Sequence, residues 1–265
     1  MDTPNNQPPT VGCAIDGPVA TLTLQRPQAM NALNAAMRRE LLAAMRQLDT
    51  TDGVRVVVLQ AAGAGFCAGN DLKEPLNPAH RDVEAMILAE YQPILDTMAA
   101  SSRLYVGAVH GTAAGIGMSL ALNCDLLWMS EGACLYPAFA PIALVPDGGA
   151  TWQLVQAMGY RRALQVLIEG RRLPAAQCLS VGLANGVAAD DGFQATVRAQ
   201  AQRLAELAPL AVQHTKRLAR SAVSTTLDQT VRDEAAAQNL TFSSADCREA
   251  VAAFFTQRQP RFTGQ

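Results

Sequence analysis

Residues 63–72 read Gly-Ala-Gly-Phe-Cys-Ala-Gly-Asn-Asp-Leu and come two residues after the apolar run 54–60, which is typical of a strand buried on both faces. The glycines are spaced G-x-G-x-x-x-G, which differs from the G-x-G-x-x-G of a dinucleotide-binding turn, and the chain has no G-K-S/T of a phosphate loop. Small side chains in this stretch let a ligand approach the main chain closely and leave N–H groups able to donate.

A second glycine-rich turn, residues 110–118, reads His-Gly-Thr-Ala-Ala-Gly-Ile-Gly-Met and runs from the apolar strand expected at 105–109 into a helix expected over 118–123. The first turn of a helix presents unpaired N–H groups and the positive end of the helix dipole. Each turn alone is compatible with tight packing and nothing more. Two such turns, each after a buried strand, predict a ligand cleft at the strand ends.

The rest of the first half alternates strands with helices. Asn31 is expected to cap the first helix, and a polar loop ending at Arg81 precedes the second. This alternation predicts an α/β fold with parallel strands and crossover helices. Besides the strands named above, the expected elements are strands at 11–16, 19–25 and 126–129 and helices at 32–48 and 83–100.

After Val145 the pattern becomes helical throughout. The chain is therefore expected to comprise a flexible N-terminal tail (1–10), an α/β core (11–190) and a helical C-terminal region (191–265). The expected helices cover 148–158, 161–168, 175–182, 193–207, 209–222, 225–240 and 244–255.

Composition excludes several classes of function. A net charge of −2 gives no electrostatic case for binding nucleic acid or an anionic membrane. Six scattered cysteines without a C-x-x-C pair indicate reduced thiols. No signal peptide and no apolar run of about 18 residues is found, so a cytoplasmic location is expected. The three histidines lack metal-ligand spacing, and no metal site is expected.

Together, the two turns and several shorter motifs resemble the crotonase (enoyl-CoA hydratase/isomerase) superfamily over nearly the whole chain. The resemblance implies a crotonase-like ββα spiral core with a helical C-terminal trimerisation region, assembled as a homotrimer or a dimer of trimers. The motifs that carry it are Thr21–Pro27 with Asn31–Leu33, Gly65–Leu72, Val109–Gly111 with Ala114–Gly117, Asn123–Asp125, Leu144–Gly148, Gly170–Leu173 with Ala175-Ala176, Gly182-Leu183, and Ala253-Phe254 through Pro260–Phe262.

The resemblance also implies an acyl-CoA thioester as substrate, with coenzyme A as part of it and no separate cofactor. It assigns the N–H groups of an oxyanion hole to Asn70 and Ile116. Phe254 matches a residue that reaches a neighbouring subunit's ligand, and Gln257 stands where some members carry a lysine near the phosphates. The coenzyme A path would be lined by Ala29, Met30, Ala68, Asp71, Leu72 and Lys73.

The acid–base group is where members of the family differ. The two glutamates of the hydratases align with Ser119 and Phe139, and neither is a carboxylate. From the residues alone, Asp147 in Pro-Asp-Gly is a helix cap or an ordinary turn residue. The resemblance instead gives it the place of the single catalytic acid of enoyl-CoA isomerases, including the ring-epoxide isomerases of phenylacetate degradation. Apolar neighbours, expected to be Phe139, Ile142, Leu144 and Trp152, would raise its pKa.

The leading hypothesis is therefore an isomerase that shifts a double bond in an enoyl-CoA. A hydratase or hydrolase with a different base remains open, and so does a dehalogenase-like enzyme in which Asp147 is the nucleophile. A relative that binds acyl-CoA without turning it over is the remaining alternative. His110 and Cys67 lie in the two turns, and a structural hydrogen bond and an inert buried thiol are the roles expected of them.

Overall fold

The computed structural model describes residues 8–75 and 79–265. Of the tail predicted at 1–10, residues 1–7 lie outside this described part, as do residues 76–78 of the polar loop before Arg81. None of the described helices is both long and apolar enough to cross a membrane.

A six-stranded sheet in the order β1-β2-β3-β4-β6-β9 forms the centre of the molecule. β1 pairs with β2 antiparallel, and all the other pairs are parallel, as the strand–helix alternation predicted. Five strands fall where they were predicted, to within two residues, whereas the short β9 was missed. The strands are β1 (Val11–Asp16), β2 (Val19–Leu24), β3 (Val56–Ala61), β4 (Leu104–Val109), β6 (Leu126–Ser130) and β9 (Gly186–Ala188).

A small second sheet contains β5 (Thr112–Ala114), β7 (Cys134–Tyr136) and β8 (Leu173–Pro174). These strands have two or three residues each, too few to show a period in the sequence, and none of them was predicted. β5 lies inside the second glycine-rich turn. The small sheet therefore extends the end of β4 toward the first turn.

The first helix begins later than predicted. α1 spans Ala35–Thr50, and its cap is Asn34, whose side chain accepts a hydrogen bond from the Met37 N–H. The expected cap, Asn31, has a left-handed backbone (φ 54°) after the short 3₁₀ turn η1 (Pro27–Ala29), so it cannot belong to the helix. Its fully buried side chain instead donates to the carbonyl groups of Ala62 and Gly65 and ties this segment to the first glycine-rich turn.

The second predicted helix is confirmed over 83–100 but contains an irregularity. It consists of α2 (Val83–Met86), one π turn, η2 (Ile87–Tyr91), and α3 (Gln92–Ala100). Turns of this kind insert a residue into a helix and are frequent at functional sites. Here the π turn carries Glu90 and Tyr91, which face α1.

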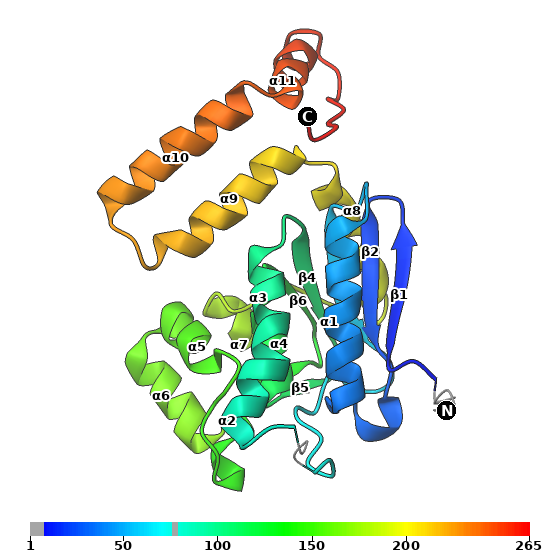
Figure 1. Ribbon diagram of the computed structural model, residues 1–265, viewed down its shortest axis with the longest axis vertical. Coiled ribbons are helices and arrows are strands. Elements are labelled where there is room, and N and C mark those ends of the chain that lie inside the picture. The colour runs from blue at the N-terminus through cyan, green and yellow to red at the C-terminus, as the bar shows by residue number, and fades with distance from the viewer. Residues whose placement is uncertain (1–7, 76–78) are drawn as a thin grey trace.

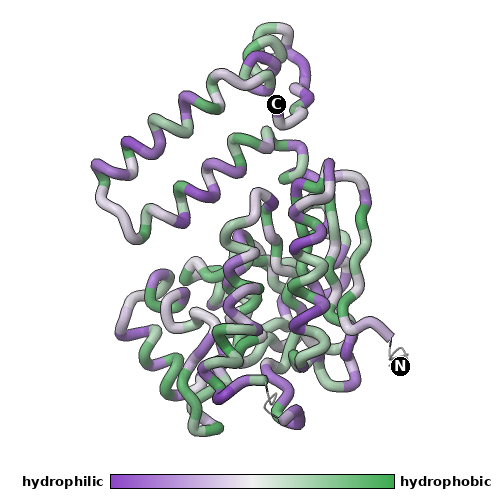
Figure 2. Tube along the Cα trace, in the orientation of Figure 1, coloured by the Kyte–Doolittle hydropathy of each residue, from purple (hydrophilic) through white to green (hydrophobic). Residues whose placement is uncertain are grey.

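Of the remaining helices, α4 lies between β5 and β6 along the chain, and the others follow β7. In Figure 1, α9, α10 and α11 extend beyond the end of the sheet, whereas α8 lies on its outer side. Figure 2 shows apolar and polar residues interspersed along α9 and α10. The helices are α4 (Ile116–Leu122), α5 (Ala150–Met158), α6 (Tyr160–Glu169), α7 (Ala175–Ser180), α8 (Phe193–Ala205), α9 (Pro209–Ala222), α10 (Leu227–Phe242) and α11 (Ala245–Phe255).

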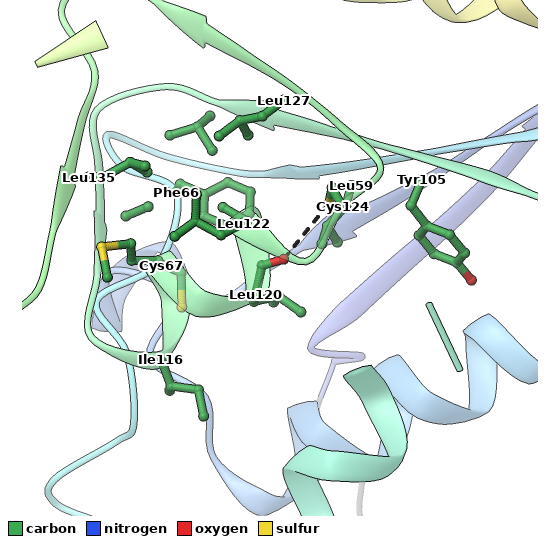
Figure 3. Packing of buried hydrophobic residues seen from close by; sticks show 14 of the residues in the cluster. Leu59, Phe66, Cys67, Tyr105, Ile116, Leu120, Leu122, Cys124, Leu127 and Leu135 are labelled. Carbon is green, nitrogen blue, oxygen red and sulfur yellow. Dashed lines mark hydrogen bonds between the residues drawn. The ribbon is translucent and has the colours of Figure 1, made fainter. Parts of the chain in front are cut away.

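Two apolar clusters cover the two faces of the main sheet. On one face, Phe193 and Val197 of α8 pack on Val56, Val58 and Val106. On the other face, a larger cluster joins α1, α3 and α4 to the sheet. Figure 3 shows part of this cluster, with Ile116 at the start of α4 beside Cys67 of the first glycine-rich turn. The core thus lies directly beneath the two turns and fixes their positions.

Candidate active site

The two glycine-rich turns run side by side at the ends of β3 and β4. Cys67 and Ala113 form an isolated parallel bridge, in which the Cys67 N–H donates to Thr112 O (3.2 Å) and the Ala114 N–H donates to Cys67 O (2.8 Å). The two turns therefore lie against each other at the strand ends, where the cleft itself stays a prediction.

Gly69 and Ile116 are in close proximity across the two turns. A Cβ atom added to Gly69 would stand 3.0 Å from Ala114 O and 3.6 Å from the Ile116 nitrogen. The backbone of Gly69 is also left-handed, with φ 101°. No larger side chain fits this position without shifting one of the turns, so glycine is needed for the close approach.

The main-chain N–H groups of Asn70 and Ile116 make no hydrogen bond within the described part of the chain. Asn70 bridges to Leu33: the Leu33 N–H donates to Gly69 O (2.7 Å) and the Asp71 N–H donates to Leu33 O (3.2 Å). In a parallel bridge the N–H of the central residue points to the opposite side. Ile116 is the first residue of α4, where no intrahelical acceptor exists. These two free donors lie on neighbouring turns, and an oxyanion hole needs two such donors aimed at one oxygen atom.

Asp147 lies in the loop before α5 and does not cap that helix. The cap is Gly149, without a side-chain hydrogen bond, so the prediction of a cap is wrong. The prediction of a turn residue is confirmed, because the Ala150 N–H donates to Asp147 O (3.1 Å). The loop packs on α4: the Ser119 hydroxyl donates to Asp147 O (2.8 Å), and a Cβ on Gly148 would stand 3.3 Å from Cδ1 of Ile116. This packing brings Asp147 to the helix that supplies one of the two donors.

The Asp147 carboxyl group is half-buried, and its Oδ1 atom is buried without a hydrogen-bond partner among the described residues. Burial disfavours the charged form and raises the pKa of Asp147 from 3.8 to about 6, although a hydrogen bond from its own N–H acts in the opposite direction. The carboxyl group is therefore tuned toward proton transfer near neutral pH.

The apolar neighbours predicted for Asp147 are only partly in place. Phe139 is buried, but Ile142, Leu144 and Trp152 are 50%, 55% and 49% exposed. These three side chains are half-exposed in the single chain, and their contact with the carboxyl group stays a prediction, whereas the loop packs on α4 through Ser119 and Ile116. The Phe139 ring adjoins the second turn, 3.9 Å from where a Gly115 Cβ would stand. Ser119 and Phe139, which align with the two hydratase glutamates, thus lie beside Asp147 and the second turn.

Most residues predicted to line the coenzyme A path lie on the surface of the first turn. The Ala68 N–H donates to Met30 O (2.9 Å), which joins the segment containing Ala29 to the turn. Leu72 and Lys73 follow, and both are exposed.

Asp71 differs from the other residues of that path. Its carboxylate forms an ion pair with Arg26 (2.9 Å), and both side chains are largely buried. Asp71 therefore supports the turn from within rather than presenting a free charge on its surface.

Phe254 is not brought to the turns within one chain. It lies in α11 and is exposed, and Gln257 follows in a left-handed conformation. In Figure 1, α11 is at the opposite end of the molecule from β5 and α2. A role for Phe254 at a site of this kind therefore requires a second copy of the chain.

The sequence reasoning missed a buried polar cluster behind Asn70. Arg38 is 2% exposed and donates to Leu33 O (2.8 Å), Glu90 (2.6 Å) and Glu74 (3.1 Å). The Tyr91 hydroxyl donates to Asn70 Oδ1 (2.6 Å). A signal was present in the sequence: Arg38 stands on the face of α1 that also carries Met37, Leu41 and Met45, where a charged residue is unexpected.

The side chains of His110 and Cys67 make hydrogen bonds to main-chain carbonyl groups. His110 Nε2 is 2.9 Å from Gly63 O and links the two turns. The Cys67 thiol is fully buried and donates to Asn31 O (3.1 Å), and burial raises its pKa to about 12. A thiol in this state is a poor nucleophile. Within the described residues, no group of three or more His, Cys, Asp or Glu side chains is placed to hold a metal ion.

Comparisons with known proteins show which proteins the chain resembles in sequence. The family model described as enoyl-CoA hydratase/isomerase matches residues 14–265. The chain is 35% identical to the 1,2-epoxyphenylacetyl-CoA isomerase of Escherichia coli (strain K12), over 93% of this chain and 95% of that protein. It is also 35% identical to a "Probable enoyl-CoA hydratase" of Rhodobacter capsulatus, over 97% of this chain and 98% of that protein.

Solved structures give the same result for the fold. An enoyl-CoA hydratase from Polaromonas sp. JS666 superposes with a TM-score of 0.89 at 28% identity, covering 96% of this chain and 99% of that one. An enoyl-CoA hydratase from Mycobacterium tuberculosis H37Rv superposes with a TM-score of 0.86 at 29% identity, covering 97% of this chain and 100% of that one.

Proposed function

The chain belongs to the enoyl-CoA hydratase/isomerase family, and on that premise we propose that it shifts a double bond in an enoyl-CoA thioester with Asp147 as its single acid–base group. The observation that carries the proposal is the state of this carboxyl group: Oδ1 is buried without a partner among the described residues, and the pKa is about 6. Near neutral pH both protonation states of such a group are accessible, so it can take a proton and give it back.

The reaction needs one proton carrier and one oxyanion hole. Ionised Asp147 takes a proton from C2 of a 3-enoyl-CoA, and the negative charge moves to the thioester oxygen between the N–H groups of Asn70 and Ile116. Neutral Asp147 then returns the proton to C4, and the double bond moves from C3–C4 to C2–C3. Because one carboxyl group performs both transfers, the absence of glutamate at positions 119 and 139 is compatible with this chemistry.

Coenzyme A enters this scheme as part of the substrate, without a separate cofactor. The exposed surface of the first turn, with Met30, Ala68, Leu72 and Lys73, supports a path for it beside the free N–H of Asn70. Lys73 is the cation of that surface available to a phosphate group. That one similar protein is named 1,2-epoxyphenylacetyl-CoA isomerase also supports an isomerase, whereas another is named a hydratase.

The test is the Asp147→Asn variant, which keeps the shape of the side chain and removes the acid–base group. Isomerisation of 3-hexenoyl-CoA, followed by ultraviolet absorbance of the conjugated product, should fall by about 100-fold or more. Asp191→Asn, at an exposed aspartate before α8, is the matched control and should leave the rate unchanged.

Hydration of crotonyl-CoA, measured in parallel, distinguishes the alternatives. Rapid hydration that survives Asp147→Asn would contradict the proposal and favour a hydratase that uses another base. Binding of both thioesters without turnover of either would favour an acyl-CoA-binding protein.

A further inference from the structure

Tyr91 connects the π turn to the predicted oxyanion hole. The side chain is 3% exposed, and its hydroxyl donates to Oδ1 of Asn70 at 2.6 Å. The π turn η2 places Glu90 and Tyr91 on the side of the helix that faces α1 and the first glycine-rich turn. Burial raises the pKa of the Tyr91 phenol well above its ordinary value, so the hydroxyl remains a donor at neutral pH.

Arg38 provides a second contact to the same side chain. Its Nη1 atom is 3.3 Å from Asn70 Oδ1 and 3.3 Å from the Tyr91 hydroxyl oxygen, and its guanidinium carbon is 5.1 Å from the centre of the Tyr91 ring. A guanidinium group only donates hydrogen bonds, so the oxygen of the Asn70 side chain, not its nitrogen, must face this cluster. Ion pairs to Glu74 and Glu90 compensate the buried charge and hold the arginine in place.

The backbone of Asn70 is otherwise held on one side only. Leu33 bonds the peptide groups before and after it, while the N–H of Asn70 itself makes no bond within the described residues. An oxyanion-hole donor must be held within about 10–20° of its productive direction. A side chain anchored at its far end restricts the torsions of its own residue and so supplies a second restraint.

We propose that Tyr91 and Arg38 are positioning residues: by holding the Asn70 side chain, they fix the direction of the main-chain N–H that stabilises the enolate. This inference rests on the proposed function, because it assumes that Asn70 supplies an oxyanion-hole donor. It assigns no proton transfer to either residue.

A double-mutant cycle tests the inference. Tyr91→Phe keeps the ring and removes the hydroxyl, and Asn70→Ala keeps the main-chain N–H and removes the anchored side chain. The readout is exchange of the C2 protons of 3-hexenoyl-CoA for deuterium, which reports enolate formation whether or not the double bond moves. Tyr105→Phe, at a buried tyrosine of β4 beside Lys216, is the matched control.

Tyr91→Phe should slow exchange about 10-fold in the wild-type background and less than about 2-fold in the Asn70→Ala background, because the tyrosine acts through that side chain. KM and the melting temperature should change little, and Tyr105→Phe should exchange at the wild-type rate.

Equal slowing in both backgrounds overturns the inference, since Tyr91 would then act by another route. If Tyr91→Phe does not fold, Asn70→Ala decides alone: an unchanged exchange rate overturns the inference, and a decrease of about 10-fold supports it. If the wild-type enzyme exchanges the C2 protons but the effects of Tyr91→Phe and Asn70→Ala are independent of each other, the inference fails and the proposed function is retained. If the wild-type enzyme neither exchanges the C2 protons nor isomerises the thioester, both the proposed function and the inference are contradicted.

Discussion

Asp147 combines a pKa of about 6 with a loop that packs on α4, the helix that begins at Ile116, and this gives a prediction for the pH dependence of the reaction. The first step needs the ionised carboxylate, so kcat/KM for isomerisation should rise with pH between about 5 and 7 and level off above that range. The midpoint should lie near 6. A profile without a titration in this range would contradict the assignment of Asp147 as the base.

The same carboxyl group predicts how stability changes with pH. Its pKa in the folded protein (about 6) exceeds the ordinary value of 3.8, so the native state holds more protons than the unfolded state between these two values. The favourable contribution of the neutral group is complete below about pH 4 and is lost as the pH rises through about 6. Urea unfolding at pH 5 and pH 7.5 should show a loss of stability in the wild type that is smaller in Asp147→Asn.

Ser119 gives a further prediction at the scale of single residues. Its hydroxyl donates to Asp147 O, so Ser119→Ala should loosen the loop and lower kcat about 10-fold while costing about 1 kcal/mol of stability. Ser180→Ala is a suitable control, because that exposed hydroxyl also bonds a carbonyl oxygen, that of Gln177. If kcat of Ser119→Ala equals that of the wild type, Ser119 does not position the acid–base loop.

Among the elements, α10 and α11 carry several large apolar side chains that are exposed to solvent in the single chain. Leu227, Phe242 and Phe255 are each at least 70% exposed, and in Figure 1 α10 touches little besides its neighbouring helices. We propose that these helices pack against further copies of the chain in a homotrimer or a dimer of trimers. Phe254 of α11 would then approach a neighbouring subunit.

This assembly predicts a mass of three or six times the 28.1 kDa of the chain in light scattering. Phe242→Glu combined with Phe255→Glu should shift the protein to smaller species, because burying two charges at an interface is unfavourable. Gln202→Glu, at an exposed position of α8, should leave the mass unchanged. A wild-type protein that runs as a monomer would contradict the proposal.

At the scale of the whole molecule, a buried charge cluster fastens the C-terminal helices to the core. Lys216 of α9 donates to Met98 O and Arg103 O, both at 2.8 Å, and pairs with Asp125 at 2.8 Å. Arg220 of α9 pairs with the other oxygen of Asp125 at 2.7 Å. Asp125 follows α4, so α9 is anchored close to the helix that carries Ile116.

Removing the shared anion should therefore destabilise the molecule strongly. Asp125→Ala leaves the buried charge of Lys216 without its partner, and the free energy of unfolding in urea should fall by about 3–5 kcal/mol. Asp228→Ala, which breaks an exposed pair with Arg232 within α10, should cost less than about 1 kcal/mol. A similar cost for both variants would show that the buried cluster does not anchor α9.

Elements with a local signal could be predicted from the order of the residues. The apolar run of β3, the alternation of strands with helices and the periodic helices were enough to predict the α/β core and the helical C-terminal region. Local signals fail for strands of two or three residues such as β5 and β8, because so short a segment shows no period. The prediction of Asn31 as the first helix cap was also wrong. Asn31 has a left-handed backbone, and its side chain bonds to Ala62 and Gly65, more than 30 residues away.

The hydrogen bonding and burial of the side chains in the candidate site could not be predicted in this way, because both depend on how the chain folds. The cluster of Arg38, Glu90 and Tyr91 joins residues about 50 positions apart, and no spacing rule connects them. Asp147 has the sequence context of a cap, yet Gly149 caps α5, and one carboxyl oxygen of Asp147 is buried without a partner among the described residues. The physical reason is that hydrogen bonding and pKa depend on which atoms surround a group, and in this chain those atoms come from distant segments brought together by packing.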